Sequence, residues 1–131
     1  MRAAEALRTE GFDGAIHLIG DEPHFPYDRP PLSKQILAGV WEPDRIALTS
    51  AEKNNDLSFE WHLGHKATEL NVQEKNIILD SGEKISFDGA IIATGARCIS
   101  LRMAGDLEGI YTLRGLDDAM AIRTELEKLP Q

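Results

Sequence analysis

The spacing of apolar and polar residues divides the chain into short helical and extended segments. Good helix formers fill Arg2 to Arg8, and Gly11 stands where a left-handed cap would end that helix. The apolar run Ala15–Gly20 predicts a buried strand. Large apolar and polar side chains alternate through Leu57–Leu63, which predicts a second strand.

A series of short extended segments follows in the second half of the chain. Strands are predicted at Lys66–Val72, Asn76–Leu79 and Lys84–Phe87, with turn residues at Asp80–Gly82. Two further strands and a final helix are predicted at Gly89–Ala93, Tyr111–Leu113 and Leu116–Leu129. Helices and strands thus alternate around a small antiparallel meander, so the predicted class is α/β with an inserted β-meander.

The segment from Pro23 to Lys34 is too rich in proline for a long regular element. Pro31 fits the first position of a short helix, which we expect to run from about Leu32 to Ala38. A single capped turn is expected at Ser50–Asn54.

Composition narrows the class of protein. The chain has 131 residues, of which 42% are hydrophobic, which suits one folded domain. Its net charge of −8 argues against nucleic-acid binding, which requires a basic face. No apolar run is long enough for a membrane span. The single cysteine, Cys98, excludes a disulfide framework and favours the cytoplasm.

Two polar segments could bind a dinucleotide. Asp21 and Glu22 follow the first predicted strand, where an acid can accept hydrogen bonds from a ribose, although a solvated loop would also contain such acids. Arg29 offers planar donors to a phosphate, and Lys34 offers a point charge for a reduced flavin. The alternative is an ordinary proline-rich loop with two exposed bases.

Other residue types add less. Thr94 and Gly95 end a predicted strand where the backbone can approach a cofactor closely, or where the strand simply turns. Cys98 has no second cysteine, so a redox-active dithiol is excluded and a small, half-buried filler is expected. No metal site is predicted, because the histidines lack zinc-like spacing. They are His17, His24, His62 and His65.

Three separated motifs carry a family resemblance. They are DEPHFPYDRPPLSK at positions 21–34, ATGAR at 93–97 and GDLEGIYTLRGLDDA at 105–119. Together they resemble the FAD-binding domain of ferredoxin and rubredoxin reductases, and of the similar apoptosis-inducing factor, in the pyridine nucleotide-disulfide oxidoreductase family. The resemblance extends from about Ala3 to Leu126. It implies a Rossmann-like, three-layer fold.

The resemblance implies that the parent enzyme transfers hydride from NAD(P)H to FAD, and then single electrons to a ferredoxin- or rubredoxin-type iron–sulfur protein. It places the adenosine ribose near Asp21 and Glu22, FAD along Arg29, and the flavin near Lys34. The remaining contacts it implies are the adenine at the backbone of Ala67, the cofactor cleft at Thr94 and Gly95, and FAD at Arg114.

The sequence also departs from that family. The family begins with a strand and a GxGxxG turn that binds the pyrophosphate, whereas residues 1–131 contain neither that strand nor any GxGxxG. We therefore expect a partial FAD-binding domain without the NAD-binding and C-terminal domains, weak FAD binding and no catalysis by this chain alone. The strands at Ala15–Gly20 and Gly89–Ala93 should keep unpaired edges. There are three alternatives: a truncated remnant, a module that associates through those edges, or another nucleotide-binding protein of the same topology.

Overall fold

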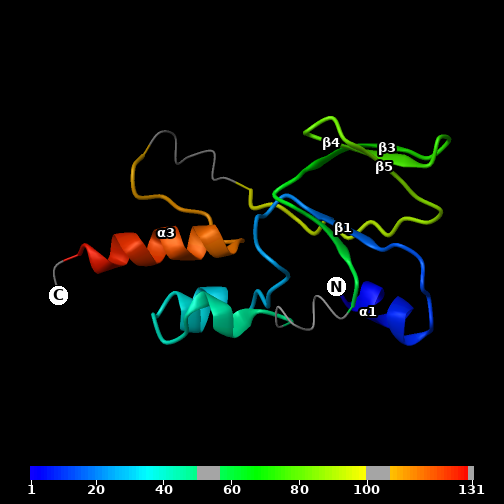
Figure 1. Ribbon diagram of the computed structural model, residues 1–131. Helices are drawn as coiled ribbons and strands as arrows, with labels where there is room; N and C mark the ends of the chain where they lie inside the picture. Colours follow the sequence, from blue (N-terminus) through cyan, green and yellow to red (C-terminus); the bar gives the residue numbers. More distant parts are fainter. Residues whose placement is uncertain (50–56, 100–106, 130–131) are drawn as a thin grey trace. The chain divides into compact units, whose positions relative to one another are not determined.

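The computed structural model describes residues 1–49, 57–99 and 107–129 of the chain (Figure 1). These residues form two compact units. The first contains Met1–Pro26 and Thr49–Ala93, and the second contains Tyr27–Leu48 and Thr94–Gln131. The turn expected at Ser50–Asn54 lies outside the described residues. No helix in the described ranges is long and apolar enough to cross a lipid bilayer.

The described residues of the first unit include helix α1 and a parallel pair of strands. Helix α1 (Arg2–Thr9) is followed by Gly11 with a φ of +86°, the left-handed conformation that the sequence predicts. Strand β1 (His17–Gly20) pairs in parallel with β2 (Glu60–Leu63). Both strands were placed correctly by the apolar pattern, but each is shorter than expected.

Apolar side chains from α1 and from the segments of both strands form the core of this unit. Ala4, Ile16 and Phe59 are buried, and Leu18 and Trp61 pack against them. Successive side chains of a strand point to opposite faces. The face that carries Leu18 and Trp61 is therefore the apolar one, and the neighbouring residues of β1 and β2 point to the other face.

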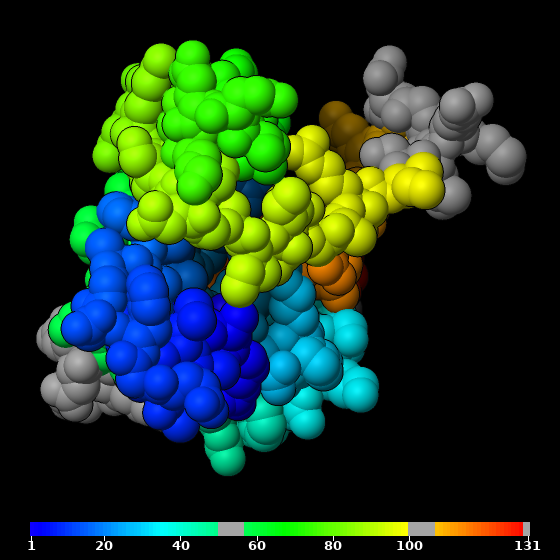
Figure 2. Space-filling model, turned by 90° about the vertical axis from the view of Figure 1, so that its right-hand side faces the viewer, coloured from blue at the N-terminus to red at the C-terminus, as the bar shows by residue number. Residues whose placement is uncertain are grey.

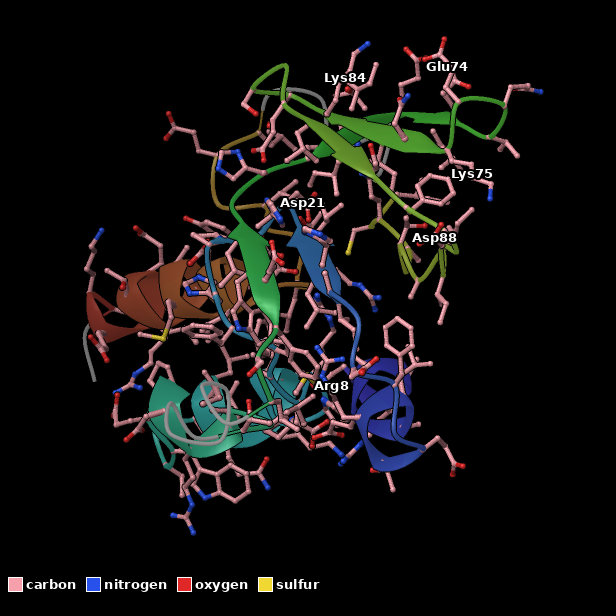
Figure 3. The ribbon with its side chains drawn as sticks, turned by 45° about the vertical axis from the view of Figure 1, so that its right-hand side comes forward. Arg8, Asp21, Glu74, Lys75, Lys84 and Asp88 are labelled. Carbon is pink, nitrogen blue, oxygen red and sulfur yellow. The ribbon has the colours of Figure 1, made fainter. Side chains whose placement is uncertain are left out.

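Arg8 fixes the loops on either side of this core (Figure 3). Its guanidinium donates to the carbonyls of Phe12 at 2.7 Å and Gly14 at 2.8 Å, and to those of Leu57 and Ser58, each at 3.0 Å. Hydrogen bonds from a charged donor are among the stronger ones. One side chain therefore joins the end of α1 to the residues that lead into β2.

The meander is the part of the first unit that the sequence predicted best. Strands β3 (Ala67–Asn71), β4 (Asn76–Leu79) and β5 (Lys84–Ser86) form an antiparallel sheet in that order. The turn before β5 contains Gly82 with a φ of +86°, a conformation that glycine adopts readily.

The strand predicted at Gly89–Ala93 does not form. In the structure this segment has no regular structure and belongs to neither sheet, and it lies on the surface in Figure 2, where it is yellow-green to yellow. Ile91 and Ile92 are 69% and 71% exposed. A strand requires hydrogen bonds to a neighbour, and in the described ranges β1 has β2 as its only sheet partner. The prediction of a strand at Tyr111–Leu113 is also wrong, since that segment has no regular structure.

The described residues of the second unit form three helical segments. A π-helix, η1 (Leu32–Ile36), replaces the short helix expected after Pro31, and a 3₁₀-helix, η2 (Pro43–Ile46), was not predicted. Helix α3 spans Leu116–Glu127. The buried residues shared by these segments are Leu32, Ile36, Ile46, Leu116 and Ala119.

Arg123 joins α3 to the loop before η2 on the surface of this unit. Its guanidinium donates to Glu42 at 3.1 Å and to Glu127 at 3.2 Å. The hydrogen bonds to Glu42 and then to Glu127 raise the pKa of Arg123 above its usual value. These pairs are solvated, so they orient the helix more than they stabilise it.

Ile36 is the side chain on which the second unit depends most for packing. It is 0% exposed, whereas Ile99 in the same unit is 94% exposed. Ile36→Ala should lower the free energy of unfolding by about 2–5 kcal/mol because it leaves a cavity. Ile99→Ala, the matched control, should change it by less than about 0.5 kcal/mol. Urea unfolding followed by tryptophan fluorescence measures both, and equal effects would contradict this packing.

Candidate functional site

A small open pocket lies in the second unit. It has a volume of about 140 Å³ and is lined by Arg29, Leu32, Ser33, Leu113 and Arg114. Pockets that enclose whole small ligands are usually about 300–1,000 Å³. This pocket therefore has room for one part of a dinucleotide rather than for all of it.

Tyr27 connects the two segments that line the pocket. Its hydroxyl accepts a hydrogen bond from the backbone N–H of Leu116 at 2.9 Å and another from Nη1 of Arg29 at 3.2 Å. Nη1 of Arg29 also donates to the carbonyl of Arg114 at 2.7 Å, and the guanidinium lies 5.1 Å from the centre of the Tyr27 ring. These contacts hold Arg29 in one orientation beside Arg114.

The segment that carries Arg114 is fixed by the start of α3. Oδ2 of Asp118 accepts hydrogen bonds from the backbone N–H groups of Arg114 and Gly115, both at 2.8 Å. Gly95 has a φ of +68°, and a β-carbon there would lie 3.3 Å from the guanidinium of Arg114. Glycine at position 95 therefore satisfies both the backbone conformation and the close approach of Arg114.

The pocket and its surroundings carry positive charge, although the chain as a whole has a net charge of −8. Lys34 is exposed on η1, next to Ser33 of the pocket. Neither the ammonium of Lys34 nor the guanidinium of Arg114 forms an ion pair within the described part of the chain. Such groups are suited to an anionic ligand such as a pyrophosphate.

The remaining candidate residues lie in the first unit. Asp21 and Glu22 follow β1, as the sequence predicts, and Asp21 is exposed (Figure 3). The carbonyl of Glu22 accepts a hydrogen bond from the N–H of Gly64 at 3.0 Å, which links the ends of β1 and β2. Ala67 is the exposed first residue of β3.

The structure thus divides the predicted residues between the two units. It brings Arg29, Gly95 and Arg114 close together, with Lys34 on the adjoining helix and the exposed Thr94 beside Gly95. Their part in cofactor binding stays a prediction. Cys98 is exposed, with its Sγ 3.7 Å from the carbonyl of Leu113, so the expectation of a half-buried filler was wrong.

Sequence reasoning missed three features. Tyr27 and Asp118 lie inside the recognised motifs, yet their bonds to the start of α3 depend on contacts that a motif does not describe. The third feature is a cluster of His17, Glu60 and His62 on β1 and β2. Only the pairing of the two strands could reveal it, because spacing along one segment shows at most two of its members.

The structure shows an α/β fold with a cationic pocket, and comparison with known proteins gives the family. Residues 1–129 match the family model described as pyridine nucleotide-disulphide oxidoreductase, and the chain belongs to that family. It is 45% identical over 92% of its length to the ferredoxin–NAD(+) reductase subunit of the benzene 1,2-dioxygenase system of Pseudomonas putida. It is 41% identical over 95% of its length to the corresponding component of the biphenyl dioxygenase system of Paraburkholderia xenovorans. The chain spans 29% and 31% of the lengths of these two relatives.

Solved structures agree with this placement. The reductase in the covalent putidaredoxin reductase–putidaredoxin complex matches with a TM-score of 0.87 and 31% identity, over 94% of this chain and 30% of that one. NADH:rubredoxin oxidoreductase from Clostridium acetobutylicum matches with a TM-score of 0.75 and 31% identity, over 86% and 29%. The Rossmann-like fold with an inserted meander is therefore confirmed. Membership in the family implies FAD and a nicotinamide cofactor in the whole reductase.

The residues of the pocket fit part of FAD. The two arginines carry the charge that a pyrophosphate requires, and Gly95 leaves space that a side chain would fill. The volume of the pocket suits one segment of the cofactor. Nothing in the lining opposes an anion, because no acidic side chain belongs to it.

Tyr27→Phe tests the connection that orients Arg29. The substitution removes the acceptor of the Leu116 N–H and one partner of Arg29. We expect the free energy of unfolding to fall by about 1–3 kcal/mol, because the amide loses its partner. Tyr111→Phe, at an exposed tyrosine of the same unit, should change it by less than about 0.5 kcal/mol. Thermal or urea denaturation measures the difference, and similar losses in the two variants would refute the proposed connection.

Proposed function

We propose that residues 1–131 are part of the FAD-binding domain of an NAD(P)H-dependent ferredoxin or rubredoxin reductase. The single observation that carries the proposal is the pocket in which Tyr27 orients Arg29 beside Arg114. Two relatives that the chain matches over most of its length are named ferredoxin–NAD(+) reductases. FAD supplies the chemistry of such an enzyme, by accepting hydride from NAD(P)H and passing single electrons to an iron–sulfur protein.

In this proposal the residues of the second unit bind the charged part of the cofactor. Arg29 and Arg114 hold the pyrophosphate, because guanidinium groups match phosphate oxygens in charge and in planar geometry. Lys34 offers a positive charge for the flavin, which gains negative charge on reduction. Thr94 and Gly95 leave the backbone close to the cofactor.

The residues of the first unit are assigned to the adenosine part. Asp21 and Glu22 would accept hydrogen bonds from the ribose hydroxyls, as acids at the end of a Rossmann strand do. Ala67 would contact the adenine through its backbone. These assignments rest on the family and on the position of each residue at the end or start of a strand.

The electron acceptor of the whole protein is proposed to be a small iron–sulfur protein of the ferredoxin or rubredoxin type. The structure of putidaredoxin reductase joined to putidaredoxin supports this class of partner. The chain has one cysteine, Cys98, and therefore no pair for an internal disulfide. A cytoplasmic location is proposed on that basis.

A second candidate function is a binding module without catalytic activity. Within the described ranges, β1 has one sheet neighbour and the irregular segment Gly89–Ala93 has none. Unpaired edges can associate with another chain. Measurement of the molecular mass in solution separates the two readings, because a monomer at all concentrations excludes self-association through these edges.

A flavin titration tests the assigned bases. The 131-residue polypeptide should bind FAD weakly. The double variant Arg29→Ala, Lys34→Ala should bind it about tenfold less tightly, since it loses two solvated charge pairs that contribute up to about 1 kcal/mol each. Arg45→Ala with Lys84→Ala removes the same charge outside the pocket and should leave the affinity unchanged. Quenching of flavin fluorescence measures all three proteins. Equal affinities would sink the assignment, and purification with stoichiometric FAD would contradict weak binding.

Turnover is the second test. The purified 131-residue polypeptide, supplied with FAD, NADH or NADPH and an artificial electron acceptor, should give no rate above that of free FAD. The physical reason is that its sequence contains no GxGxxG for either dinucleotide. Sustained oxidation of either nicotinamide that scales with the amount of polypeptide would overturn this expectation.

A further inference from the structure

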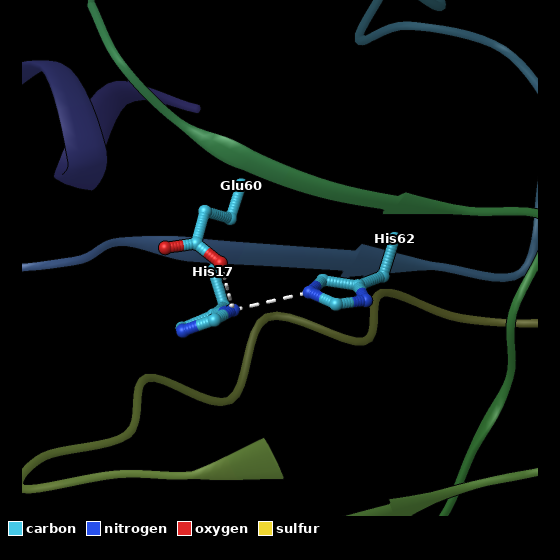
Figure 4. Close-up of side chains that lie close together, drawn as sticks. All are labelled: His17, Glu60 and His62. Atoms are coloured by element: carbon cyan, nitrogen blue, oxygen red, sulfur yellow. Dashed lines mark hydrogen bonds and ion pairs between the residues drawn. The ribbon is translucent and has the colours of Figure 1, made fainter. Parts of the chain in front are cut away.

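The pairing of β1 with β2 brings three metal-binding side chains to one face of the sheet. His17 is opposite Glu60, and Ile19 is opposite His62. Residues two apart on a strand share a face, so Glu60 and His62 point to the same side. His17 points there too, because the apolar side chains of β1 and β2 pack on the other face. Figure 4 shows the three side chains gathered at this place.

The ligand atoms are already spaced as a metal ion would need them. Nδ1 of His17 lies 3.0 Å from Nε2 of His62 and 3.5 Å from a carboxylate oxygen of Glu60. All the ligand atoms lie within 4.8 Å of one another. Two nitrogens bound to tetrahedral Zn²⁺ at about 2.0–2.1 Å are roughly 3.3 Å apart. The two distances from His17 are within a few tenths of an ångström of that value. The carboxylate of Glu60, whose side chain is 57% exposed, has room to turn toward His62 and complete the site.

A second carboxylate lies close to His62, although beyond hydrogen-bonding distance. Nδ1 of His62, the ring nitrogen that does not face His17, lies 4.0 Å from a carboxylate oxygen of Glu83. A histidine that binds a metal through one nitrogen commonly donates its other N–H to a carboxylate. The side chains of His62 and His17 are 15% and 29% exposed, and that of Glu60 is 57% exposed. The histidines are thus partly shielded, and an ion can still reach them from solvent.

We propose that His17, Glu60 and His62 form a binding site for a divalent transition-metal ion of the Zn²⁺ type. The ligands are Nδ1 of His17, Nε2 of His62 and the carboxylate of Glu60. Imidazole nitrogens favour Zn²⁺, Ni²⁺ and Cu²⁺ over Mg²⁺ and Ca²⁺, which prefer oxygen ligands. Three protein ligands leave a fourth position of a tetrahedral ion for water or an exogenous ligand. The ion would link β1 to β2, and Glu83 would orient His62.

Calorimetric titration of the purified chain with ZnCl₂ tests the site. One Zn²⁺ should bind per chain and raise the melting temperature, because a ligand that binds only the folded state stabilises it. Mg²⁺ at the same concentration should do neither. Co²⁺ in place of Zn²⁺ should give the visible absorption of a four-coordinate ion. Absence of saturable Zn²⁺ binding, or binding of Mg²⁺ with equal affinity, would overturn the proposal.

Variants identify the ligands. His17→Gln, His62→Gln and Glu60→Gln should each weaken Zn²⁺ binding by at least about tenfold, and Glu83→Gln should weaken it by about 10–100-fold, the usual effect of losing an outer partner. His65→Gln is the matched control, because His65 is an exposed histidine of the same unit that pairs with Asp80. Circular dichroism confirms that each variant is folded. If one of the histidine variants fails to fold, the exposed Glu60 still provides the test. Unchanged affinity in Glu60→Gln, or an equal loss in His65→Gln, would show that the ion binds elsewhere.

Discussion

The hydroxyl of Tyr27 is the point on which the second unit depends. It accepts hydrogen bonds from the first amide of α3 and from Arg29, so it joins residues that are 89 positions apart in the sequence. Without that acceptor, the Leu116 N–H would lose its partner in a part-buried position, and such a group destabilises a fold. The same oxygen also sets the orientation of Arg29 beside Arg114. The Tyr27 hydroxyl therefore contributes both to the stability of this unit and to the geometry of its pocket.

The sequence predicted correctly those helices and strands that are determined by residues close together in the chain. The bounds of β4 (Asn76–Leu79) agree exactly, because turn residues follow it directly and its apolar run is short. The prediction at Gly89–Ala93 failed for a different reason, since an apolar run becomes a strand only beside a hydrogen-bonding neighbour. Similarly, Pro31 correctly indicated where a helix begins, but not its type. The hydrogen bond from the N–H of Ile36 to the carbonyl of Pro31 makes η1 a π-helix, and it forms where Ile36 is fully buried.

The candidate sites show the same limit. The motifs predicted Arg29 and Arg114, and the structure brings these two residues together at one pocket. They could not show that Tyr27 orients Arg29, because that contact forms only when distant segments pack. The cluster of His17, Glu60 and His62 could not be predicted from the motifs at all. Its members come from two strands, and a change of one residue in their register would turn Glu60 and His62 to the apolar face.

In the proposed function the pocket binds an anion through side chains, and the start of α3 gives the reason. The beginning of a helix usually offers free N–H groups to a phosphate. Here the N–H groups of Arg114 and Gly115 are bound by Asp118, and that of Leu116 is bound by Tyr27. The carboxylates of Asp117 and Asp118 in the first turn also oppose negative charge. The guanidinium groups of Arg29 and Arg114 therefore supply the attraction, and in an open, solvated pocket such pairs contribute only about 1 kcal/mol or less each. We therefore expect residues 1–131 to bind FAD weakly, because their sequence contains no glycine-rich turn that would add backbone donors.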